Sequence, residues 1–136
     1  MAQTLLFEKP FYIDNAGGVG KNVCVVQGAA NGTCKLPTAQ NAAGFLGVTI
    51  ESQPNQNRGV GVCRLGVFNM LAGGTIARGD RVGINSAAGD VRSVEALIIA
   101  SPMGNAVIHV VGRAEVAAVS GDLFPVMIQD YTVNGA

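Results

Sequence analysis

Short apolar runs separated by glycine recur along the whole of this 136-residue chain. Glycine provides 19 residues, about twice its average share, and it lies between Val/Ile-rich runs rather than in one linker. Within the runs, apolar and polar residues alternate: His109 separates Ile108 from Val110, and Arg113 and Glu115 continue the histidine's row. Alternation with a period of two is typical of strands, and glycine supplies the backbone angles of tight turns. The pattern predicts an all-β fold.

We expect a single β domain over residues 1–136, built as a small sandwich or barrel, jelly-roll-like or related. About eight short strands are predicted, over residues 22–28, 45–51, 59–70, 80–85, 90–95, 97–100, 106–118 and 123–129. Because Glu95, Ala96 and Leu97 are good helix formers, a short helix over residues 93–100 is the alternative to a strand there. Residues 1–21 are expected to form an N-terminal arm, and residues 130–136 a C-terminal tail.

The charge content excludes several classes of partner. Only 13% of the residues are charged, and Lys+Arg equals Asp+Glu at 9 each, so no bulk field attracts nucleic acid or an anionic membrane. No apolar run reaches the 18 or so residues that cross a bilayer, and a basic, apolar leader is absent, which predicts synthesis in a host cytoplasm. A chain with 49% hydrophobic residues and so few charges is typical of a subunit whose faces are covered by neighbours.

The cysteines predict neither a disulfide framework nor a metal site. Cys24, Cys34 and Cys63 make an odd number without close spacing, and His109 is the sole histidine. Disulfide frameworks use an even number of cysteines, and zinc sites need closely spaced cysteines with histidines. We therefore expect free thiols packed as small apolar groups, and no metal.

The tripeptide Arg78-Gly79-Asp80 has two interpretations. Some extracellular proteins present these residues to cell-surface receptors, which would make the chain an adhesive module. However, Gly79-Asp80 directly precedes the apolar run at residues 81–84, and a second pair, Gly89-Asp90, precedes the run at residues 91–94. Glycine gives a turn its unusual backbone angles and aspartate bonds nearby backbone N–H groups, so the tripeptide is predicted to be a turn that enters a strand.

No catalytic residue or cofactor site is predicted. The segment at residues 14–22 (DNAGGVGKN) lacks the first glycine of a phosphate loop and has Asn22 where a Ser or Thr is required, so we expect a glycine-rich turn. A nucleophile paired with His109 would be the enzymatic alternative, but no serine lies in a Gly-x-Ser-x-Gly elbow.

The order of the turn and strand motifs between residues 40 and 130 resembles the structural cement (decoration) proteins of tailed-bacteriophage capsids. The matching motifs are Phe45-Leu46-Gly47-Val48, the Gly66-Val67 step, the turn Ala77-Arg78-Gly79-Asp80-Arg81-Val82, and the closing strands at residues 111–119 and 124–129 around Ser120-Gly121-Asp122. The resemblance implies a β-rich protein that oligomerises, as a dimer or trimer, and bridges major capsid protein subunits on the outer surface of the virion. It implies no enzymatic activity and no cofactor.

Candidate contact residues lie in the two termini and on the polar face of one strand. They are Leu5, Leu6, Phe7, Phe11, Tyr12, His109, Arg113, Glu115, Tyr131 and Val133. The termini hold hydrophobic residues outside the clearest strands, and they either contact neighbours or fold back onto their own barrel. The alternative function is a tail-fibre or adhesive host-recognition module that uses the Arg78-Gly79-Asp80 loop.

Overall fold

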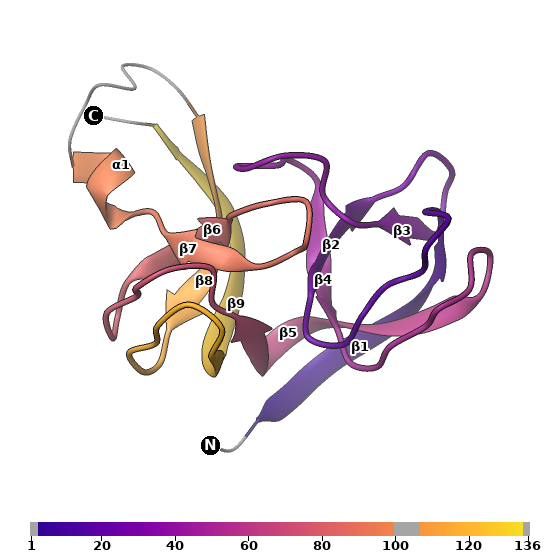
Figure 1. Cartoon of the computed structure of the whole chain (residues 1–136), viewed down its shortest axis with the longest axis horizontal. Helices are drawn as coiled ribbons and strands as arrows, with labels where there is room; N and C mark the ends of the chain where they lie inside the picture. Colours follow the sequence, from indigo (N-terminus) through magenta and orange to yellow (C-terminus); the bar gives the residue numbers. More distant parts are fainter. Residues whose placement is uncertain (1–2, 100–106, 135–136) are drawn as a thin grey trace.

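The computed structural model of the chain covers residues 3–99 and 107–134. Within these residues the chain forms nine strands and one short helix (Figure 1). The strands are β1 (Thr4–Ile13), β2 (Cys24–Gln27), β3 (Thr33–Lys35), β4 (Phe45–Thr49), β5 (Gly59–Leu71), β6 (Arg81–Ile84), β7 (Val91–Ser93), β8 (Val107–Ala114) and β9 (Leu123–Asn134), and the helix is α1 (Glu95–Ile99). The predicted all-β fold is confirmed.

The strands form two small barrels that share β5. In the first barrel the order is β1-β3-β2-β4-β5, and β5 pairs back with β1 to close the ring. The sheet continues from β5 through β9, β8 and β6 to β7. A parallel bridge between Ala72 and Val91, with a hydrogen bond of 2.7 Å from the Gly73 N–H to the Val91 carbonyl, brings β7 back to the end of β5. Figure 1 shows β5 crossing from one barrel to the other.

The length and composition of β5 allow it to serve both barrels. Its 13 residues bury Val60 and Val62 in the core of the first barrel and Phe68 and Met70 in the core of the second. Gly66 lies between these parts with a φ of +117°, and a Cβ at this position would collide with the carbonyl oxygen of a β1 residue. Glycine is therefore required where β1 crosses close to β5.

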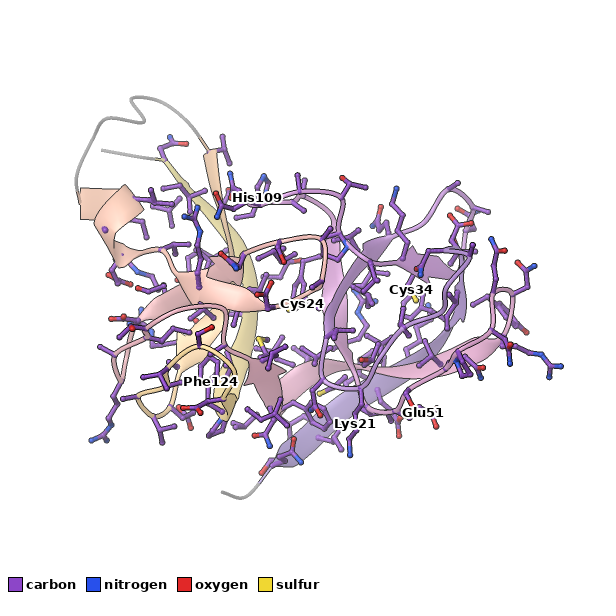
Figure 2. The ribbon with its side chains drawn as sticks, in the orientation of Figure 1. Lys21, Cys24, Cys34, Glu51, His109 and Phe124 are labelled. Carbon is purple, nitrogen blue, oxygen red and sulfur yellow. The ribbon has the colours of Figure 1, made fainter. Side chains whose placement is uncertain are left out.

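Strands β2 and β4 form a wall between the barrels. Leu46 of β4 packs in the first core, whereas its neighbours Phe45 and Val48 pack in the second. All five residues of β4 are buried, because one face of the strand is covered by each barrel. Cys24 of β2 lies in the second core and Cys34 in the first, as Figure 2 shows.

The three cysteines are free and buried, as predicted. Burial raises the pKa of the Cys24 thiol far above its ordinary value, and it raises that of Cys34 to about 11. The pKa of Cys63 is also raised, mainly by burial. These thiols therefore stay protonated and pack as apolar groups.

Both predicted Gly-Asp pairs lie in turns: Gly89, before β7, has a φ of +82° and its N–H donates to the Ser86 carbonyl at 3.1 Å, and the pair Gly79-Asp80 forms a turn before β6. Gly79 has a φ of +87°, and a carboxylate oxygen of Asp80 accepts a hydrogen bond of 2.9 Å from the Ala77 N–H. The same turn recurs at Val119–Asp122, where Gly121 has a φ of +93° and Asp122 accepts a bond of 3.0 Å from the Val119 N–H. Each turn leads directly into a strand, β6 or β9.

These two turns are related by reciprocal backbone bonds. Ile76 and Ala118, which precede the turns, exchange hydrogen bonds of 2.8 and 2.9 Å. The first turn bonds to Ala114 at the end of β8, through the Gly79 N–H and the Asp80 carbonyl, and the second bonds to Ala72 beside the end of β5 in the same way. The second barrel thus contains two copies of one strand–loop–turn–strand unit, which face each other across a local two-fold axis.

Three segments differ from the sequence-based expectations. Residues 95–99 form α1, so the strand predicted over residues 97–100 is wrong and the helix alternative is correct for the described part. Strand β8 ends at Ala114 instead of residue 118, because the chain leaves the sheet to make the loop before the second turn. Strand β3 was not predicted, because three residues are too few to show a pattern.

The structure places about half of the expected N-terminal arm and most of the expected C-terminal tail in strands. Residues 4–13 form β1, and β9 continues to Asn134, where it pairs with Val107. The remaining ends of the predicted segments, at residues 1–2, 100, 106 and 135–136, lie outside the described residues.

Helix α1 covers one side of β8 and β9. Leu97 and Ile98 pack against the buried residues Ile108 and Val110. Glu95 anchors the helix by accepting hydrogen bonds of 2.7 Å from the Arg81 guanidinium, and this bonding lowers the pKa of Glu95 to about 2.

Candidate interaction surface

In the part of the chain that the structure describes, the His109 side chain makes no hydrogen bond to a nucleophile. It is half-buried on β8 opposite Thr132, and its backbone N–H donates a hydrogen bond of 2.8 Å to the Asn41 side chain. Further along β8, Arg113 donates to the Gly79 carbonyl at 2.8 Å. Within residues 3–99 and 107–134, no group of three or more His, Cys, Asp or Glu side chains could hold a metal ion.

The glycine-rich segment at residues 14–22 is a turn. It leads into strand β2, whereas a phosphate loop leads into a helix whose N-terminus faces the phosphate. Asn22, at a φ of +63°, is buried, and its side-chain amide donates to the Asn69 carbonyl at 2.9 Å. The segment therefore joins the two barrels instead of presenting amides to a ligand.

None of the described helical residues forms a segment with the length and hydropathy to cross a bilayer.

Hydrogen bonds hold the Arg78-Gly79-Asp80 tripeptide in its turn. Besides the bond between Asp80 and Ala77, the Gly79 N–H donates to Ala114 at 2.9 Å and its carbonyl accepts from Arg113. The carboxylate that an adhesive loop would present to a receptor is half-buried and already holds the turn together.

Exposed and half-buried apolar side chains gather on three adjacent strands, β1, β5 and β9. Phe7 is opposite Leu65, Val67 is opposite Met127, and Leu71 is opposite Leu123. The β5 members all belong to one alternating row of the strand, which also contains Asn69, so they point to the same side. We call the six residues Phe7, Leu65, Val67, Leu71, Leu123 and Met127 the β1–β5–β9 face.

The β1–β5–β9 face is apolar and largely accessible in the single chain. Phe7, Leu65 and Leu123 keep 49%, 54% and 55% of their surface exposed. A hollow of about 350 Å³ adjoins Phe7 and Leu65, and its remaining lining is Phe45, Leu46, Arg64 and Asp130. Contiguous exposed apolar surface of this kind marks sites of protein–protein contact.

The candidate contact residues from the sequence are divided among several environments. Leu5, Leu6, Phe7 and Tyr12 are exposed on β1, and Arg113 and Glu115 are exposed near the end of β8. Phe11 is buried in the first core, while Tyr131 and Val133 are half-buried beside α1. The structure therefore brings only Phe7 of this set onto the β1–β5–β9 face.

The other five residues of the β1–β5–β9 face were missed as contact candidates. The signal was present in β5, whose sequence GVGVCRLGVFNM is apolar on both faces, a pattern that fits either a sandwich interior or a covered surface. Because these β5 residues pair with exposed β9 residues, the interpretation as a covered surface applies. This pairing is visible only in the tertiary structure.

No protein-family model and no curated protein matches the sequence. Among solved structures, the chain is similar to the N base of the head fiber gp8.5 of bacteriophage phi29. The two share 16% sequence identity, the match covers 90% of this chain and 95% of that one, and the TM-score is 0.62. Nearly the whole chain therefore shares the fold of a phage head-fiber base.

Proposed function

We propose that this protein is a non-enzymatic structural protein of a bacteriophage head, and specifically a capsid cement (decoration) protein. On this proposal it forms a dimer or trimer and bridges major capsid protein subunits on the outside of the head, which stabilises the head against internal DNA pressure. The observation that carries the proposal is the exposed β1–β5–β9 face. The fold shared with a phage head-fiber base supports it.

The physical basis of the proposed bridging is apolar contact repeated by symmetry. Burial of exposed side chains such as Leu65 and Leu123 contributes about 25 cal/mol per Å², from which the entropy of association is subtracted. One copy alone would bind weakly. Many linked copies on a symmetric shell would dissociate slowly, because each contact holds its neighbours at high effective concentration.

A second candidate is the base of a head fiber, and the solved structure of such a base favours it. This candidate uses the same apolar face but places the protein at isolated positions instead of across subunit boundaries. In both candidates the Arg78-Gly79-Asp80 segment acts as a turn, because Asp80 is bonded within it.

Addition of purified protein to undecorated phage heads tests the proposal. We expect a dimer or trimer by mass photometry and saturable binding to heads. Leu65→Asp should abolish binding, because it places a charge on the β1–β5–β9 face at a residue that is 54% exposed. Val107→Asp is the matched control: Val107 is 45% exposed and lies outside the face, so this variant should bind normally.

A protein that is only monomeric and never binds to heads would contradict the proposal. Electron microscopy of decorated heads separates the two candidates, since density that spans neighbouring capsid subunits supports cement and isolated projecting density supports a fiber base.

A further inference from the structure

The first barrel has a polar mouth at one end. Along β1, Lys9 follows the same side of the strand as the buried residues Phe11 and Ile13. Along β5, Arg64 likewise continues the row of the buried residues Val60 and Val62. Two inward-facing rows of apolar side chains therefore end in a cation at the same end of the barrel.

Both cations lie over one aromatic ring. The Lys9 ammonium is 5.4 Å from the centroid of the Phe11 ring, and the Arg64 guanidinium carbon is 5.6 Å from it. Phe11 is only 6% exposed, so the ring forms the floor of the mouth. The Arg64 Nε donates a hydrogen bond of 2.9 Å to the Leu46 carbonyl, which fixes the guanidinium plane and leaves its terminal amino groups for another partner.

A hollow of about 390 Å³ opens above this floor. It is lined by Phe11, Leu46, Arg64, Gln27 and the loop at residues 28–33. The mouths of β-barrels are common ligand sites, and this volume lies at the small end of their range. It suits one or two side chains of a partner better than a cofactor.

The guanidinium of Arg64 has no ion-pair partner among the described residues. Within residues 3–99 and 107–134 the ion pair that forms is Arg81–Glu95, and neither Lys9 nor Arg64 has a carboxylate within ion-pair distance. Asp14, which belongs to the same barrel, uses a carboxylate oxygen to accept a bond of 2.8 Å from the Ala29 N–H on the rim loop. Lys9 lies over the same ring but outside the lining of the hollow, so Arg64 is the cation that an anion in the hollow would contact.

We propose that the mouth of the first barrel is a carboxylate-binding pocket that takes an acidic segment of a neighbouring protein. A carboxylate can accept two hydrogen bonds from the Arg64 fork, while its methylene groups pack on Phe11 and Leu46. This proposal adds a contact site to the proposed function. It rests on that function in one respect only, which is that the neighbouring protein is a capsid subunit.

The experiment is an NMR titration of the full chain with a hexaglutamate peptide, and inorganic phosphate serves as the second arm. We expect saturable shifts of the Arg64 Nε–H and of the amides at residues 28–33. Arg64→Gln should weaken binding about tenfold or more, because a charge-assisted forked bond is lost. Lys9→Gln should weaken it about two- to fivefold, as for an exposed ion pair. The controls Arg58→Gln and Lys21→Gln remove exposed cations elsewhere and should leave binding unchanged.

Lys9→Gln keeps the test valid if Arg64→Gln fails to fold, since Lys9 is exposed. Three results would contradict the carboxylate-binding pocket. They are the absence of shifts with hexaglutamate, equal binding of the peptide by all variants, and binding of phosphate but not of the peptide. If the peptide does not bind but the protein still decorates heads, the pocket fails and the cement proposal stands. If the peptide binds but heads are never decorated, the cement proposal fails and the pocket stands.

Discussion

The two barrels of this molecule are closed in different ways: β1 and β5 pair at eight positions to close the first, whereas the bridge between Ala72 and Val91 closes the second. In the second barrel β8 and β9 pair over seven residues, and the two Gly-Asp turns bond reciprocally to the strand ends. In the first barrel the short strand β3 pairs with β1 at only two positions and with β2 at only two. The comparison teaches that each barrel has its own weakly paired element, which is strand β3 in the first barrel and the bridge between β7 and the end of β5 in the second.

The largest effect should come from the core of the second barrel. Phe124 is 2% exposed, and Phe124→Ala should lower the free energy of unfolding by about 3–5 kcal/mol, because it removes apolar contacts and leaves a cavity. Denaturant unfolding measures this change. The neighbouring Leu123→Ala is the control and should cost less than about 0.5 kcal/mol, since Leu123 is exposed. A loss below about 1 kcal/mol for Phe124→Ala would contradict the assigned core.

The next effect tests whether the two turns of the second barrel are equivalent. Asp80→Ala and Asp122→Ala each remove a carboxylate that accepts a backbone N–H, and each should cost about 1–2 kcal/mol. The same unfolding measurement applies, with Asp130→Ala as an exposed control. If the losses in free energy of unfolding differ by more than about 1 kcal/mol, the two turns are alike in geometry but not in their contribution to stability.

Thiol labelling compares the two barrels directly. Cys34 lies in the weakly paired strand β3, whereas Cys24 lies in the wall between the barrels. Because local opening exposes the less paired region more often, we expect an alkylating reagent to modify Cys34 about tenfold faster than Cys24 under native conditions. Mass spectrometry of the labelled peptides gives both rates. Faster reaction of Cys24 would reverse the proposed order of stability.

The smallest effect is pH-dependent and belongs to α1. Bonding to Arg81 lowers the pKa of Glu95 to about 2 from an ordinary value of 4.5, so its contribution to stability is fully present above pH 4.5. This contribution, about 1 kcal/mol for a partly exposed pair, is lost as the pH falls from 4.5 through 2. Unfolding midpoints of the wild type and Glu95→Gln should converge across that range, while Glu51→Gln should follow the wild type. A constant difference between Glu95→Gln and the wild type would refute the linkage.

Several features of the fold could be predicted from local sequence. The alternation around His109 indicated β8, and the two Gly-Asp pairs at residues 79–80 and 89–90 indicated turns before β6 and β7. These features depend on neighbouring residues only, so a short window of sequence contains their cause. The free thiols could be predicted for the same reason, from cysteine number and spacing.

The candidate surface was predicted less well. Phe7 was identified, but Leu65, Leu123 and Met127 were not, because an apolar residue in a strand has the same appearance whether it faces a core or the solvent. Phe11 shows the converse: it was a contact candidate, and within the single chain it is buried in the first core.

The sequence by itself determined that the chain forms strands, where most of them begin, and that Gly79-Asp80 makes a turn, because these outcomes follow from backbone preferences and side-chain alternation within a few residues. Only the tertiary structure decided that β5 serves two barrels, that two turns 42 residues apart, at Asp80 and Asp122, face each other, and that Lys9 and Arg64 both lie over the Phe11 ring. Contacts of this kind join residues that are distant along the chain. Their partners are set by strand register and by how the barrels close, which no local pattern contains.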